Sequence, residues 1–210
     1  MTTLRVDASA LPWSAEEAGV AHKLLAPADE QDPSSTSLVR LAPGAALPAA
    51  DDADGREFVV LEGELRLEGR PLAAGGYARQ PAGSVAQAST DAGCVLYMKE
   101  GPHAPEDTAP AWVPEDATPW LPGQGGLTVK PLHQAGSTGT AFVHWPAGER
   151  FLPHRHWGGE EIYVLSGTFR DEHGAYPAGT WIRSPHLSEH HPFVVEETVI
   201  FVKTGHLRAQ

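Results

Sequence analysis

The sequence predicts an all-β protein made of two tandem barrels or sandwiches, and three observations support this fold class. Short runs rich in β-branched and aromatic residues, such as Glu57-Phe-Val-Val-Leu and Thr198-Val-Ile-Phe-Val, alternate with turns that use the chain's 22 glycines and 19 prolines. No long segment places apolar residues at the helical period of about 3.6. The third observation is an internal repeat.

The repeat pairs residues of the two halves at one constant separation. Leu61-Glu-Gly63 recurs as Leu165-Ser-Gly167, 104 residues later. The same separation relates Gly75, Arg79, Pro81 and Lys99 to Gly179, Arg183, Pro185 and Lys203. Upstream, Pro12-Trp13 recurs as Pro119-Trp120, 107 residues later. A Pro-rich stretch near residues 101–111 reads as a linker, so we expect one domain at residues 1–104 and a second at residues 105–210.

Composition limits the partners that the protein can have. With 27 acidic and 15 basic residues the formal charge is −12, which disfavours nucleic acid and anionic membranes. The single cysteine, Cys94, excludes an internal disulfide and a zinc site built on several thiolates. Since no export or membrane signal is visible either, we expect a cytoplasmic protein.

Histidines concentrate in the second half, where nine of the eleven lie beyond the linker. His154 and His156 would share one face of a strand, and a turn at Gly158-Gly159 would return Glu160 beside them. A fourth donor is available in Ser188-Glu-His190-His191. Three imidazoles and one carboxylate suit iron, manganese, nickel, copper or zinc, and a six-coordinate ion would keep two positions open. The alternative is a solvated polar loop.

The spacing around these residues resembles the motifs of the cupin superfamily. The first cupin motif, G-x5-H-x-H-x3-E-x6-G, is matched by Gly148, His154, His156, Glu160 and Gly167. The second, P-x-G-x2-H, is matched by Pro185 to His190, with Leu187 in place of the glycine. The segments His154–Glu161, Phe169–Gly174, Tyr176–Gly179 and His190–Phe193 are most similar to the ChrR-like cupins.

This resemblance implies a double-stranded β-helix (jelly-roll) barrel in each half. It also implies one divalent metal ion in the C-terminal cupin, held by His154, His156, Glu160 and His190. We favour Fe(II), with zinc, manganese or nickel as alternatives. The departure at Leu187 leaves His186 and His191 open as alternatives to His190.

The first copy serves as an internal comparison for the site. The four predicted ligands correspond to Ala50, Asp52, Arg56 and Ala86, so we expect a degenerate, metal-free barrel. Asp52 and Arg56 are expected to form an ion pair; alternatively, Arg56 binds a carboxylate ligand in place of the metal. Glu161, Arg183 and Lys203 have identical residues in the first copy, which assigns them to the scaffold.

Several residues occur only in the metal-bearing copy. They are Trp157, Tyr163, His186 and His191, in place of Ala53, Val59, Ala82 and Gln87. We take His191 and Tyr163 as catalytic candidates close to the metal, although strand alternation would turn Tyr163 away from Glu160.

The resemblance points to a metal-dependent enzyme, an Fe(II)-type dioxygenase that cleaves a small diketone or hydroxyketone. The alternative is a non-catalytic metal-binding sensor related to the ChrR anti-sigma factors. Binding to a sigma factor is not expected, because the helical zinc domain of those proteins has no equivalent here. By analogy with other cupins, we expect a homodimer that acts on a small-molecule substrate.

Overall fold

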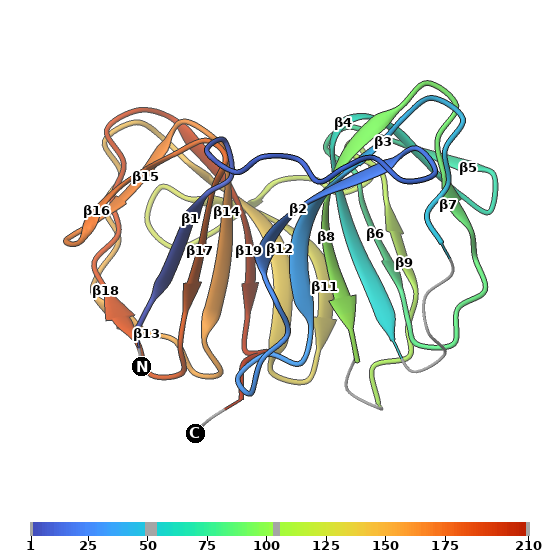
Figure 1. Cartoon of the computed structure of the whole chain (residues 1–210). Coiled ribbons are helices and arrows are strands. Elements are labelled where there is room, and N and C mark those ends of the chain that lie inside the picture. Colours follow the sequence, from blue (N-terminus) through green and yellow to red (C-terminus); the bar gives the residue numbers. More distant parts are fainter. Residues whose placement is uncertain (1, 49–53, 103–105, 209–210) are drawn as a thin grey trace. The chain divides into compact units, whose positions relative to one another are not determined.

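The computed structural model of the chain describes residues 2–48, 54–102 and 106–208. These residues form strands, turns and loops and contain no α-helix, which confirms the predicted all-β class. No helix in the described ranges could cross a membrane. The chain divides into two compact units, Leu11–Ala117 and Met1–Ala10 with Thr118–Gln210. We call them the first barrel and the second barrel (Figure 1).

The first barrel is organised around one long strand. Its strands are β2 (Val20–Ala26), β3 (Ser35–Leu41), β4 (Gly55–Leu67), β5 (Arg70–Ala73), β6 (Tyr77–Gln80), β7 (Ala88–Ser89), β8 (Cys94–Gly101) and β9 (Ala111–Val113). They pair in the order β2-β3-β8-β4-β6-β9, while β5 and β7 pair with the far end of β4. The buried cluster between these strands includes Phe58, Val60 and Leu96, each at most 1% exposed.

The second barrel repeats this plan. Its strands are β1 (Leu4–Asp7), β10 (Leu121–Pro122), β11 (Thr128–Ala135), β12 (Thr138–Trp145), β13 (His154–Arg155), β14 (Glu160–Ser166), β15 (Thr168–Asp171), β16 (Gly174–Pro177), β17 (Thr180–Ser184), β18 (Glu189–His190) and β19 (Thr198–Thr204). The main sheet runs β1-β17-β14-β19-β12-β11-β10, and β13-β18 and β15-β16 form two small ladders. Ile162, Val164 and Ile200 lie in its core.

The two copies exchange their first strands. Leu4 of β1 pairs with Arg183 of β17. The equivalent residue of the second copy, Ala111 of β9, pairs with Arg79 of β6, the counterpart of Arg183. Each exchanged strand thereby covers a sheet edge that would otherwise present unpaired N–H and C=O groups.

This exchange makes the compact units differ from the domains expected at residues 1–104 and 105–210. The first ten residues belong to the second barrel, and the first barrel continues to Ala117. The repeat in the sequence marks where each copy begins, whereas strand pairing determines which barrel each end segment joins.

Candidate metal centre

Four side chains of the second barrel converge at one point. The ligand atoms of His154, His156, Glu160 and His190 all lie within 4.8 Å of one another. The three imidazole rings form a triangle with centroid separations of 4.7, 4.9 and 4.7 Å. Glu160 lies beneath them, with one oxygen 3.5 Å from His156 Nδ1 and the other 3.7 Å from His190 Nε2.

Two short strands and one turn bring these donors together. In the ladder between β13 and β18, His154 lies directly opposite His190. The chain then turns through Gly158 and Gly159, whose φ angles are +73° and +69°. A Cβ atom on Gly158 would lie 2.7 Å from the backbone of Gly205, so only glycine fits there. The turn places Glu160 at the first position of β14.

Burial shifts the pKa values of three of the four donors, His154, His156 and Glu160. Burial lowers the pKa of His154, and burial with smaller effects of His190 and His154 lowers that of His156 to about 3. These imidazoles are therefore neutral at pH 7. Burial raises the pKa of Glu160 to about 7, although His190 acts in the opposite direction.

The donor set also fits a metal because two buried atoms lack other partners. Within the described part of the chain, His156 Nε2 and Glu160 Oε2 are shielded from water and make no hydrogen bond. Such groups are costly to bury unless something binds them, and a cation in the centre of the cluster would do so. His154 Nδ1 lies 3.0 Å from the carbonyl oxygen of Leu152, which leaves Nε2 for the cluster.

The neighbouring histidines lie apart from this cluster. His186 accepts a hydrogen bond from the Gly158 N–H at its Nδ1 (2.8 Å), and its ring contacts Trp157. His191 is exposed, and its backbone N–H donates to Glu172. Of the three alternatives for the fourth donor, His190 is the one that the fold brings to His154, His156 and Glu160.

Tyr163, the other catalytic candidate, also lies away from the donors. It is buried on β14 in register with Trp181 and Phe201. Glu160, Ile162 and Val164 alternate with it along the strand, and the latter two face the barrel core. Tyr163 therefore packs on the opposite face of the sheet. Glu161 points to that face too, where its carboxylate accepts a hydrogen bond from Trp181 Nε1 (2.7 Å).

A chain of polar side chains behind His190 was not identified from the sequence. Asp171 Oδ2 lies 3.8 Å from His190 Nδ1. Tyr176 donates its hydroxyl to Asp171 Oδ1 (2.7 Å), and Arg5 Nε donates to the Tyr176 hydroxyl (2.9 Å). Burial alone would raise the pKa of Asp171, but His190, Tyr176 and the His173 backbone N–H outweigh it and lower the pKa to about 2.

Comparison of the two copies could have pointed to Asp171 and Tyr176 from the sequence. Asp171 and Tyr176 correspond to Leu67 and Leu72, two core residues of the first copy. A carboxylate and a phenol thus replace two leucines only in the barrel that has the four donors. We infer that they orient His190.

The equivalent place in the first barrel contains an ion pair between Arg56 and Glu100. Arg56 occupies the position that corresponds to Glu160. Its Nη2 lies 2.5 Å from Glu100 Oε1, and its Nη1 donates a hydrogen bond to the Pro48 carbonyl (2.6 Å). Glu100 is thus one carboxylate partner of Arg56. The predicted partner, Asp52, lies outside the described residues, as does Ala50. Among the residues described for this barrel, no group of three His, Cys, Asp or Glu side chains, all from this barrel, lies close enough together to hold a metal ion.

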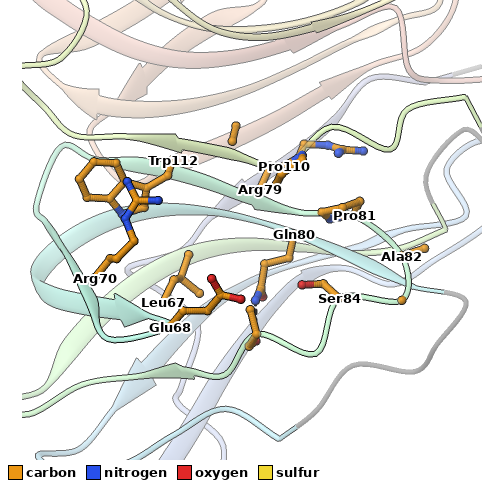
Figure 2. A pocket seen from close by; sticks show the side chains of 13 residues that line it. Leu67, Glu68, Arg70, Arg79, Gln80, Pro81, Ala82, Ser84, Pro110 and Trp112 are labelled. Atoms are coloured by element: carbon orange, nitrogen blue, oxygen red, sulfur yellow. Dashed lines mark hydrogen bonds between the residues drawn. The ribbon is translucent and has the colours of Figure 1, made fainter.

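Cavities open around this position in the first barrel. One of about 350 Å³ is lined by Arg56, Pro48 and Ala86 among others. A neighbouring one of about 540 Å³ is lined by small residues such as Ala82, Gly83 and Ser84, with Arg70 stacked on Trp112 at another side (Figure 2).

Comparison with known proteins agrees with the geometry. The sequence model of the ChrR cupin-like domain matches residues 1–104 and again residues 108–208. The chain belongs to this family. Its fold is accordingly that of a bicupin, with two tandem cupin barrels. No curated protein sequence matches it significantly.

Solved structures share the cupin fold at low sequence identity. A protein from Pseudomonas aeruginosa described as a candidate glyoxylate-induced protein is 16% identical, with a TM-score of 0.77 over 96% of this chain and 88% of its own. A candidate dioxygenase from Nostoc punctiforme is also 16% identical, with a TM-score of 0.78 over 96% and 81%. Oxalate decarboxylase from Bacillus subtilis is 14% identical, with a TM-score of 0.72 over 98% and 78%.

Proposed function

We propose that the second barrel binds one divalent metal ion through His154, His156, Glu160 and His190 and acts as an Fe(II)-type dioxygenase on a small diketone or hydroxyketone. The observation that carries this proposal is the cluster of three imidazoles and one carboxylate, in which the buried atoms His156 Nε2 and Glu160 Oε2 make no hydrogen bond. The solved cupins include a candidate dioxygenase and an oxalate decarboxylase whose Mn(II) centres have been described, which supports metal-dependent chemistry in this fold.

The residues of the chain define what the site can do. Histidine binds a metal as the neutral imidazole, so a divalent ion held by three imidazoles and the Glu160 carboxylate would retain one net positive charge. That charge would attract a substrate bound as its enolate through two oxygens. When bound, Fe(II) would supply Lewis-acid activation and a redox-active centre for the reaction of O2 with the substrate, which is the species oxidised. In the overall cleavage, both oxygen atoms of O2 enter the two carbonyl products.

Access to the cluster is one-sided. His156, Glu160 and His190 are buried, whereas His154 is half-buried and reaches the surface. A substrate would therefore approach beside His154. Asp171 and Tyr176 lie behind His190, away from that approach, where they would hold the imidazole in position without touching substrate.

The test combines metal analysis with oxygen uptake. Purified protein should contain close to one transition-metal ion per chain, and His190→Ala should lose it. Anaerobically loaded Fe(II) protein should consume O2 with a β-diketone or a hydroxyketone. His173→Ala is the matched control, because His173 is exposed and outside the cluster.

The possible results separate the alternatives. Metal binding without O2 uptake on any such substrate would remove the dioxygenase and favour the metal-binding sensor. A metal-free protein whose stability is unchanged by His154→Ala would remove the metal site itself. The homodimer and the cytoplasmic location remain predictions, which light scattering and fractionation would test.

A further inference from the structure

Three large apolar side chains are exposed next to the donors of the second barrel. Leu152, Trp157 and Leu187 are 69%, 74% and 43% exposed. In sequence they lie two residues before His154, one after His156 and three before His190. We propose that these residues, the apolar collar, select substrates whose chelating oxygens carry a bulky apolar substituent. The proposal rests on the metal site proposed above.

The first barrel shows where these positions lie in a cupin barrel of this chain. The counterparts of Leu152 and Leu187 are Pro48 and Gly83, and both line the cavities of the first barrel. Figure 2 shows the neighbouring Ala82, the counterpart of His186, at the edge of that cavity. The counterpart of Trp157, Ala53, lies outside the described residues. Two of the three collar positions therefore correspond to cavity-lining positions of the first barrel, where that copy has Pro48 and Gly83.

The backbone at or next to each collar residue forms a hydrogen bond with a donor histidine or with another segment of the second barrel. The Leu152 carbonyl lies 3.0 Å from His154 Nδ1, and the Leu187 N–H donates to the His156 carbonyl (2.9 Å). Trp157 is followed by Gly158, whose carbonyl accepts the Leu207 N–H (2.7 Å). The exposed side chains are thus presented by an ordered backbone, which lowers the entropic cost of binding a ligand.

Leu187 places an apolar side chain at a backbone position that is unfavourable for any residue with a Cβ atom. Its φ angle is +61°, in the left-handed region that disfavours residues with a Cβ atom. Gly83, the equivalent residue of the first barrel, has nearly the same φ of +74° without this cost. The strained leucine occurs only in the copy with metal donors, and strain of this kind concentrates at functional sites.

A substrate accounts for these features directly. It must reach the cluster beside His154, the one donor that is not fully buried, and Leu152, Trp157 and Leu187 are the exposed large apolar residues within three positions of a donor histidine. A substituent next to the chelating oxygens would cover the exposed faces of the collar and remove apolar surface from water on both partners.

The experiment compares two chelators that differ only in their apolar end, acetylacetone and benzoylacetone. Co(II)-loaded full-length protein is titrated with each, and the visible spectrum of the metal reports binding. Wild type should bind benzoylacetone about tenfold or more tightly than acetylacetone, once corrected for the enolate fraction. Trp157→Ala and Leu187→Gly should each reduce this preference several-fold, because the affinity for benzoylacetone falls more than the affinity for acetylacetone.

The matched control is Val195→Ala, which truncates an apolar side chain that is 66% exposed outside the collar. It should retain the wild-type preference. Leu187→Gly introduces the residue used by the first barrel, so it should fold and melt no lower than wild type.

Each remaining outcome would overturn the proposal in a distinguishable way. Equal affinities for both chelators on a Co(II)-loaded protein would reject the collar and leave the metal site standing. Absence of a Co(II) spectrum would reject the metal site and the collar together. If collar variants dissociated a dimer without changing the preference, the collar would be an interface between two copies.

Discussion

Asp171 offers the most direct test of how the second barrel positions the candidate ligand His190. Asp171→Asn keeps an oxygen that can accept hydrogen bonds from Tyr176, His173 and Gly174, but it removes the negative charge that faces His190. The substitution is nearly isosteric, so any effect reports the charge rather than a cavity.

The magnitude follows from the pKa of Asp171, which is lowered from 3.8 to about 2. At ~1.4 kcal/mol per unit this would correspond to an upper limit of ~2.4 kcal/mol, and screening by nearby water reduces it to ~1–2 kcal/mol. We expect Asp171→Asn to lower the free energy of unfolding of the metal-free protein by that amount at pH 7. Metal affinity should fall by roughly 10- to 100-fold, the usual effect of losing a carboxylate behind a ligand histidine.

The pH dependence gives the sign of the effect. Because the pKa is lower in the folded protein, the stabilisation is fully present above pH ~4 and is lost as the pH falls toward ~2. Urea unfolding of wild type and Asp171→Asn should therefore differ by a constant amount from neutral pH down to pH ~4 and converge below it.

The assays are urea denaturation at several pH values and competition with a chromophoric chelator for Co(II). Tyr176→Phe should show a smaller loss of affinity, because it removes one hydrogen bond to Asp171 and leaves the charge. Asp91→Asn, on the surface of the first barrel, is the control. Unchanged metal affinity in Asp171→Asn, or a stability difference that persists at pH ~2, would refute the reasoning.

Three further predictions concern other groups. Metal affinity should weaken about tenfold per pH unit below pH ~7, because Glu160, with its pKa raised to about 7, must release a proton; pH-independent chelator competition would contradict this. Burial raises the pKa of Cys94 to about 11, so the folded protein should resist thiol-specific reagents at pH 8 and react only after unfolding. Gly205→Ala should destabilise by ~2 kcal/mol or more in urea titrations, since its Cβ would lie 2.1 Å from the Ser137 carbonyl; Gly179→Ala, with positive φ but open space, should lose less.

Local patterns in the sequence were sufficient for much of the fold and part of the site. Short β-branched runs between glycine and proline turns indicate strands wherever they occur. The constant separation of 104 residues reveals the duplication, and the spacing of His154, His156 and Glu160 follows from a single strand and turn. These features depend on residues close in the chain or on comparison of one copy with the other.

Other features depend on contacts between distant segments. His190 is distinguished from His186 and His191 only by the ladder that places it opposite His154. The strand pairing of β14 places Tyr163 on the opposite face of the sheet from Glu160, away from the donors.

The sequence by itself determined the class of fold, the two copies and the residues able to bind a metal, because turn residues, alternation and repeat spacing are local. Only the tertiary structure decided which strand completes each barrel and that Glu100 pairs with Arg56. It also decided that Arg5, at the start of the chain, joins Tyr176 and Asp171 behind His190. The physical reason is that edge-strand pairing and buried charge neutralisation are satisfied by whichever groups the folded chain brings together, however far apart they lie in sequence.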